Sequence, residues 1–271
     1  MSAPIRRPAM EYKKILFEIV DNVAIIRLND PAVLNAFDLT LTHELDAAID
    51  RAANSARAMI ITSVGRAFSA GANLSGDLGD ADESGEVDAG SVLETTINPL
   101  MVKLSRLPIP FITAVRGAAA GVGCSLALSA DIIVASETAY FLQAFAKIGL
   151  VPDGGSSWLL MRAIGRVRAM EMMLLAERLP AAKALEWGLV TRVTSDEELE
   201  STALDLARQL ASGPTRSLGM IRETAWAAAD KDWIDALATE RRLQKDAGRT
   251  KDNQEGISAF MEKRAPVFTG A

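Results

Sequence analysis

Runs of apolar residues near the start of the chain predict antiparallel strands. Residues 15–20 (ILFEIV) and 23–28 (VAIIRL) are rich in β-branched side chains and are separated only by Asp21 and Asn22. A two-residue connection made of Asp and Asn is typical of a β-hairpin. The chain is therefore expected to open with a hairpin.

Helical and strand patterns then alternate. Asp38 is placed to cap a helix, because the apolar residues after it recur at helical spacing. Apolar strand patterns follow at 58–63 (AMIITS), 111–115 (FITAV) and 131–136 (DIIVAS), with a helical stretch near 91–106 before the second of them. Such alternation predicts parallel strands joined by right-handed crossovers in an α/β core.

Strand signals almost disappear beyond residue 154. The exception is 189–193 (LVTRV), and helical patterns fill the rest of the chain. We therefore expect an α/β core over residues 1–200 and a helical region over residues 201–271.

Composition narrows the class of protein. The chain has 271 residues, 49% of them hydrophobic, and a net charge of -6, which argues against sequence-independent binding to nucleic acid. Cys124 is the single cysteine and His43 the single histidine, so neither a disulfide framework nor a Cys/His metal site is expected. No apolar run is long enough to span a membrane. A cytoplasmic protein is the natural interpretation.

Two glycine-bearing turns follow predicted strands, at residues 68–73 (FSAGAN) and 117–123 (GAAAGVG). Small residues let the main chain approach a ligand closely, and a helix beginning near Val122 would direct free N–H groups at it. Tight packing of the turns is the alternative explanation. The acidic segment 74–90 nearby has the composition of a surface loop and is a candidate lid.

Several motifs resemble the crotonase family, the enoyl-CoA hydratase/isomerase superfamily. They are GRAFSAGANL, AAAGVGCSLALSADI, KIGLVPDGGSSWLL and EGISAFMEKRAPVFTG, with NDPAVLNAF and LPAAKALEWGLVTRV at matching places. The resemblance implies an α/β fold with a crotonase-like ββα superhelix core and a C-terminal helical trimerisation region, in a homotrimer or hexamer. It implies an acyl-CoA substrate whose thioester oxygen lies between the main-chain amides of Ala72 and Val122, and no cofactor beyond that coenzyme A.

Two residues depart from the hydratase pattern. The glutamates with which similar hydratases activate water and protonate carbon fall on Ser125 and Phe145 here. Phenylalanine transfers no proton and serine is a poor acid or base without a partner, so hydration by that pair is not expected.

Asp153, in GLVPDGG, is the remaining candidate acid/base. Dienoyl-CoA isomerases and ring-epoxyphenylacetyl-CoA isomerases of the family resemble this segment and use an aspartate there. Isomerisation needs one base, because a proton removed at one carbon of an allylic system can return at another. Capping of the following helix is the alternative role of Asp153.

Other functions stay open at this stage. Attack on the acyl group by Asp153 or water, as in dehalogenase or hydrolase relatives, is the second enzymatic interpretation. A non-catalytic acyl-CoA binding protein is the third.

The predicted substrate-binding residues come from the two turns, from nearby aromatic side chains and from the C-terminal segment, where Lys263 is a candidate contact for the CoA phosphate. Core packing explains the aromatic ones equally well. The predicted set is Phe68, Ala70, Gly71, Leu74, Gly121, Phe145, Trp158 and Lys263.

Overall fold

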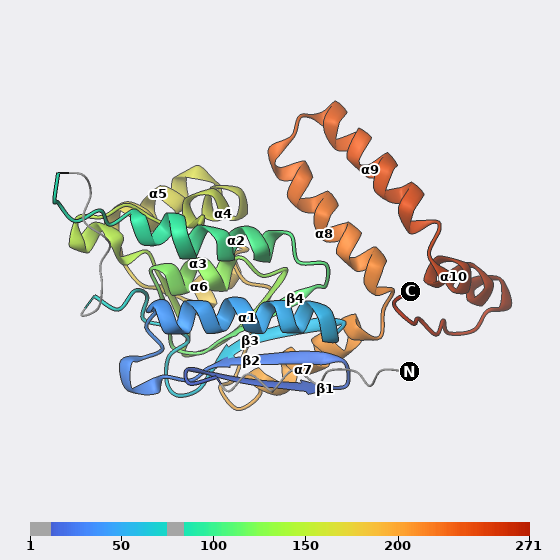
Figure 1. Ribbon diagram of the computed structural model, residues 1–271, viewed down its shortest axis with the longest axis horizontal. Helices are drawn as coiled ribbons and strands as arrows, with labels where there is room; N and C mark the ends of the chain where they lie inside the picture. The colour runs from blue at the N-terminus through green and yellow to red at the C-terminus, as the bar shows by residue number, and fades with distance from the viewer. Residues whose placement is uncertain (1–11, 75–83) are drawn as a thin grey trace, which may run out of the picture.

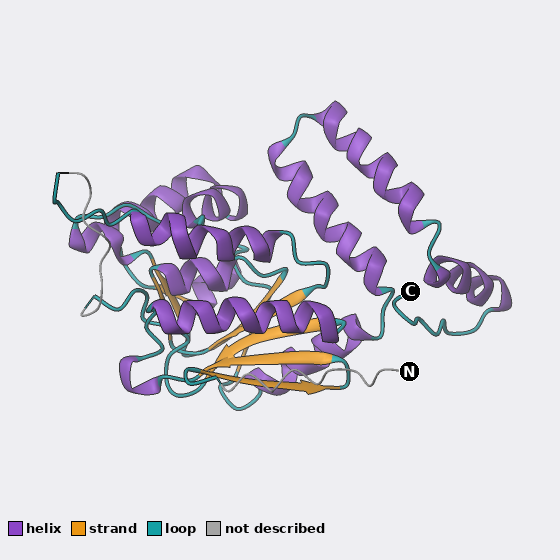
Figure 2. Ribbon diagram, in the orientation of Figure 1, coloured by secondary structure: helices purple, strands orange, loops and turns teal. Residues whose placement is uncertain are grey.

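The structure is a computed structural model that describes residues 12–74 and 84–271. Most of the expected acidic loop, residues 75–83, lies outside the described residues. The described chain forms a body of two sheets and surrounding helices, from which the last three helices extend (Figures 1 and 2).

Six strands form the main sheet in the order β1-β2-β3-β4-β6-β9, and all neighbours are parallel except the β1-β2 hairpin. These strands are β1 (Ile15–Val20), β2 (Val23–Leu28), β3 (Ala58–Ser63), β4 (Phe111–Val115), β6 (Ile132–Ser136) and β9 (Arg192–Thr194). The hairpin prediction is confirmed, and both Asp21 and Asn22 have the positive φ that a type I′ turn requires.

Side chains alternate across this sheet and create two cores. On β2, Ile26 faces the core covered by α1 (Leu39–Ser55), whereas Ile25 faces α7 (Leu199–Ala211) on the opposite side. Figure 1 shows α1 and α7 on the two sides of the strands. The boundary expected at residue 200 falls within α7, a helix that packs on the sheet.

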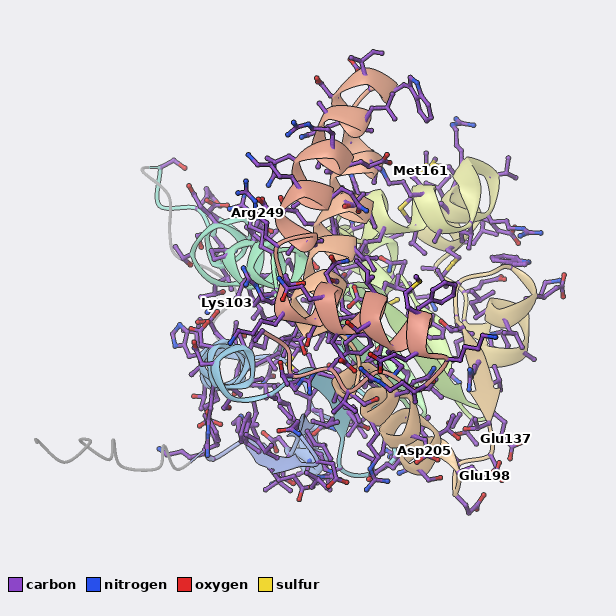
Figure 3. The ribbon with its side chains drawn as sticks, turned by 90° about the vertical axis from the view of Figure 1, so that its right-hand side faces the viewer. Lys103, Glu137, Met161, Glu198, Asp205 and Arg249 are labelled. Carbon is purple, nitrogen blue, oxygen red and sulfur yellow. The ribbon has the colours of Figure 1, made fainter. Side chains whose placement is uncertain are left out.

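The predicted cap of α1 is confirmed. The Asp38 carboxylate accepts a hydrogen bond from the Leu41 N–H at 2.9 Å. Lys103 of α2 (Asn98–Ser105) then fixes α2 beside α1 through ion pairs with Asp46 and Asp50 at 2.7 and 2.8 Å, and Figure 3 shows Lys103 between these two helices.

A second, three-stranded sheet includes part of the second predicted glycine-bearing turn. Its strands are β5 (Ala118–Ala120), β7 (Tyr140–Leu142) and β8 (Leu179–Pro180). Residues 117–123 were expected to be a turn, and this was wrong for the three alanines, which pair with β7. Alanine has little β-propensity, so only the tertiary pairing reveals this strand.

Short helices complete the body of the protein. They are η1 (Pro31–Val33), η2 (Leu93–Ile97), α3 (Val122–Leu128), η3 (Ala144–Ile148), α4 (Ser156–Ala163), α5 (Gly165–Leu175) and α6 (Ala181–Glu186). Within the described ranges, no helix is long and apolar enough to cross a bilayer.

The last three helices are α8 (Thr215–Asp230), α9 (Trp233–Ala247) and α10 (Lys251–Glu262), which stand away from the sheet in Figure 1. Buried Arg222 of α8 anchors them. Its Nε contacts both carboxylate oxygens of Asp131, at 2.6 and 2.7 Å. Its Nη atoms donate to the carbonyl oxygens of Leu104 and Leu107.

Arg222→Met should therefore be strongly destabilising. The substitution leaves Asp131 without its cation and removes one donor from each of two carbonyl groups, which we expect to lower the free energy of unfolding by about 3 kcal/mol. Urea unfolding at fixed protein concentration measures the loss. Arg242→Met is the matched control, because the Arg242–Glu223 pair is exposed and should contribute less than about 1 kcal/mol. Equal effects of the two substitutions would contradict the anchoring role.

Candidate active site

Two hydrogen bonds hold the predicted glycine-bearing turns side by side. The Ser69 N–H donates to Ala118 O and the Ala120 N–H donates to Ser69 O, both at 2.9 Å, which forms a parallel bridge between Ser69 and Ala119. Ala72 and Val122 each come three residues after a partner in this bridge. The bridge thus carries both predicted amide donors to the same place.

Glycines make this contact close. A Cβ on Gly71 would stand 3.0 Å from Ala120 O, and one on Gly123 would stand 2.5 Å from the Ser69 Cβ. Gly71 and Gly121 also have positive φ, which a larger residue adopts only with strain. Packing of the turns, the alternative explanation, is therefore real and coexists with the site.

The Ala72 N–H is left free by the pairing around it. The Phe37 N–H donates to Gly71 O at 2.7 Å and the Asn73 N–H donates to Phe37 O at 2.8 Å. In a parallel bridge the central residue directs its own groups to the other side. Within the described residues, the Ala72 N–H has no protein acceptor.

The Val122 N–H is free for a different reason. Val122 is the first residue of α3, and the first N–H groups of a helix have no intrahelical acceptor. The N–H of the preceding residue, Gly121, is already bonded to Leu142 O at 2.9 Å. In the part of the chain that the structure describes, no acceptor is bonded to the Val122 N–H.

Both amide-bearing residues line one cavity of about 580 Å³, together with Asp153. The cavity is bounded mainly by apolar side chains from the start of α1, from the end of the first glycine turn, from η2 and the segment before it, and from the end of η3 and the loop after it. These apolar residues are Phe37, Leu39, Leu74, Val87, Val92, Leu93, Ile97, Ile148 and Leu150.

Asp153 is a carboxylate with an unusual environment. Its Oδ1 is buried and, within the described ranges, has no hydrogen-bond partner. Burial raises the pKa of Asp153 to about 6. Its side chain does not cap α4, since the N-cap is Gly155 and Asp153 contributes only its carbonyl oxygen, which accepts from the Ser156 N–H at 3.1 Å. The helix-cap alternative is therefore wrong.

A second carboxylate in the cavity wall, Asp38, is already engaged. Burial alone would raise the pKa of Asp38, but hydrogen bonds from Leu41 and Lys14 outweigh burial and hold that pKa below its usual value. Asp38 is thus a committed anion, while Asp153 is poised to exchange a proton near neutral pH.

Ser125 and Phe145 behave as structural residues. The Ser125 hydroxyl is completely buried and donates to Asp153 O at 2.9 Å. Phe145, in η3, is buried, and its ring would lie 3.8 Å from a Cβ placed on Gly121. Neither supplies a carboxylate.

The remaining predicted residues are partly brought together. Ala70, Gly71 and Gly121 belong to the paired turns, and Leu74 lines the cavity. Phe68 is fully buried in the core, and Lys263 lies at the C-terminal end of α10, outside the residues that line the cavity.

Trp158 lies elsewhere. Its ring stacks on Trp226 of α8 with centroids 5.2 Å apart, and its Nε1 donates to Asp230 at 3.0 Å. The prediction that Trp158 contacts the acyl group is not supported, because its direction on α4 is set by packing against α8.

Sequence reasoning missed part of the cavity wall. Phe37 lies at the end of the NDPAVLNAF motif, where buried Asn35 fixes the loop by donating to Ala67 O at 2.9 Å and Val64 O at 3.1 Å. The motif was a signal for this loop, but not for the pairing of Phe37 with the first glycine turn. Ile97 and its neighbours in η2 carry no signal beyond an apolar pattern.

Two other reactive residue types play no part in the cavity. Cys124 is fully buried, and burial raises the pKa of its thiol to about 12, so we expect this thiol to be inert. His43 is exposed on the polar side of α1.

Comparison with known proteins identifies the family to which this chain belongs. The family model for enoyl-CoA hydratase/isomerase matches residues 18–271. A Rhodobacter capsulatus protein named "Probable enoyl-CoA hydratase" is 41% identical and covers 96% of this chain and 100% of its own length. The 1,2-epoxyphenylacetyl-CoA isomerase of Escherichia coli is also 41% identical, over 94% of this chain and 98% of its own.

Solved structures agree. The crystal structure of an enoyl-CoA hydratase from Bacillus anthracis has a TM-score of 0.88 and 29% identity, and the match covers 96% of this chain and 100% of that one. The chain belongs to the enoyl-CoA hydratase/isomerase family and has the crotonase fold.

The buried carboxyl of Asp153 should lower stability at neutral pH. Its pKa of about 6 lies above the value in an unfolded chain, so stability falls as pH rises from about 4 to about 6, by at most about 3 kcal/mol. Asp153→Asn removes this cost. We expect the melting temperature of the variant to exceed that of the wild type at pH 7.5, and the difference to vanish near pH 4. A pH-independent difference in differential scanning calorimetry would contradict this account.

Proposed function

We propose that the protein isomerises an acyl-CoA thioester through an enolate, with Asp153 as its single acid/base group. The observation that carries this proposal is the state of the two carboxylates in the cavity. Asp38 is paired with Lys14, whereas the buried Oδ1 of Asp153 has no partner among the described residues. Of these two described carboxylates, Asp153 is therefore the one available to take up and return a proton.

The reaction follows from this geometry. The Asp153 carboxylate takes a proton from carbon, and the electrons of the broken C–H bond move onto the thioester oxygen. The Ala72 and Val122 N–H groups stabilise this oxygen, each by about 3 kcal/mol in comparable sites. Protonated Asp153 then returns the proton at another carbon of the conjugated system, which moves the double bond.

The substrate class follows from the cavity wall. Aliphatic side chains dominate the wall, so a neutral, apolar acyl group is favoured, and about 580 Å³ accommodates an aromatic or medium-length aliphatic group. Coenzyme A enters as part of the substrate, and we propose no separate cofactor. A cytoplasmic location agrees with the single, buried cysteine.

Isomerisation is favoured over hydration because neither Ser125 nor Phe145 supplies a carboxylate. Hydration requires a group that positions water as well as one that protonates carbon. The name of the Escherichia coli relative supports isomerisation, while the name of the Rhodobacter capsulatus relative points to hydration. The side chains of this cavity favour isomerisation.

Proton exchange tests the proposal. In D₂O, NMR on a panel of unsaturated aliphatic and aromatic CoA esters should show deuterium entering the acyl group with wild-type protein. Because the base must be ionised, exchange should increase with pH through about 6 and then level off. We expect Asp153→Asn to slow exchange by a factor of about 10³.

Two controls make this test specific. Asp230→Asn replaces a carboxylate that is bonded to Trp158 outside the cavity and should exchange at the wild-type rate. The melting temperature of Asp153→Asn shows whether that variant is folded. Exchange that survives in folded Asp153→Asn would refute the base assignment, and a trapped aspartyl-acyl intermediate would favour hydrolase-type chemistry instead.

We also propose that the chain assembles as a homotrimer or hexamer through α8–α10. Large apolar side chains are exposed on these helices, and Phe260 and Met261 are 82% and 76% exposed. Patches of this kind mark protein interfaces. Further copies of the same chain would cover them.

Replacing both Phe260 and Met261 with glutamate should therefore weaken assembly, because charge would be buried at the contact. Light scattering coupled to size-exclusion chromatography measures the molar mass. The control is Val167→Glu on α5, which alters a residue of similar exposure, 77%, away from α8–α10. A monomeric wild-type protein would contradict the proposal.

A further inference from the structure

Ser125 occupies a connecting position in the site. It lies on α3, whose first residue carries the Val122 N–H, and its hydroxyl is completely buried. The hydroxyl donates to Asp153 O at 2.9 Å and also lies 3.3 Å from the O atom of Gly121, the N-cap residue of α3. One side chain thus joins the helix of an amide donor to the loop of the proposed base.

The loop that carries Asp153 packs closely against α3 because Gly154 has no side chain. A Cβ on Gly154 would stand 2.8 Å from the Ser125 Cβ and 3.7 Å from Cγ2 of Val122. Gly154 has a φ of 55°, so both its conformation and its surroundings favour glycine. The space beside residue 125 is therefore closed to a long side chain unless the loop moves.

The opposite side of the loop is held by α4. Ser156 donates its N–H and its hydroxyl to the same Asp153 carbonyl, at 3.1 and 3.0 Å, and its hydroxyl is also 3.1 Å from Oε1 of buried Gln143. The Asp153 main chain is thus clamped between two helices, while its side chain is left free to enter the cavity.

We propose that Ser125 is a positioning residue that sets the Asp153 carboxyl against the thioester-binding amides. This inference rests on the proposed function of Asp153 as acid/base. The hydroxyl acts through the Asp153 main chain and does not itself exchange a proton with substrate. A small hydrogen-bonding side chain at this place therefore allows one aspartate to serve where a pair of carboxylates is absent.

The electrostatic surroundings make this positioning measurable. Among the described residues that line the cavity, the other titratable side chain is Asp38, which is paired with Lys14, and Lys147 on η3 is exposed. Burial is the cause of the shifted pKa of Asp153. Loosening the loop would admit water to the carboxyl and bring its titration to lower pH.

The test compares Ser125→Ala with Ser129→Ala. Ser129 is also buried at the end of α3, but its hydroxyl donates to Leu126 O, within the same helix turn, at 2.8 Å. The Asp153 carboxyl is observed by NMR in protein labelled with ¹³C at aspartate side chains, and Asp153→Asn assigns its signal. Exchange kinetics and melting temperatures are measured on the same samples.

We expect Ser125→Ala to lower kcat for exchange by a factor of about 10 while KM stays within about twofold, because binding is unchanged and alignment is lost. Its Asp153 titration should move to lower pH by about one unit. Ser129→Ala should match the wild type in both measurements.

An Asp153 titration in folded Ser125→Ala that matches the wild type would overturn the proposal, and so would equal losses in Ser129→Ala. Absence of exchange by the wild type would refute the proposed function instead. The NMR titration needs no turnover, so it still decides whether Ser125 positions the carboxyl.

Discussion

Two hydrogen bonds between Ser69 and the strand at Ala119 bring two distant segments into register. This bridge fixes the two main-chain amides of the cavity relative to each other. Ala72 comes three residues after Ser69, and Val122 comes three residues after Ala119. Ser125, on the helix that begins at Val122, is hydrogen-bonded to Asp153 O. Because glycines line the contact, the two main chains meet directly, with no flexible side chains between them.

The same burial serves both halves of the proposed chemistry. Apolar walls desolvate Asp153, which makes it a stronger base than an exposed aspartate, and they strengthen the interaction of an enolate oxygen with two amides. The folded protein bears the cost, since one carboxylate oxygen of Asp153 is held out of water with no partner among the described residues. Asp38 avoids that cost through Lys14 and is correspondingly unsuited to proton transfer.

Local patterns predicted the strands β1–β4 at their observed bounds, because β-branched runs and an Asp-Asn turn are encoded in adjacent residues. They failed for β5, whose three alanines are a strand only because β7 lies beside them. The two amide donors and Asp153 were predicted from the family motifs, and in the structure all three residues line one cavity. Phe37 and Ile97 were missed, and Trp158 was misplaced, since long-range packing decides which side chains reach that cavity.

A binding site made of main-chain N–H groups has an evolutionary consequence. Replacing the side chain of Ala72 or Val122 by any residue other than proline leaves the donor in place, provided the glycine turns keep their shape. The proposed acid/base side chain, in contrast, lies in the loop before α4, outside both turns. Under the proposed function, such a frame would let a lineage exchange one reaction for another while thioester recognition is inherited.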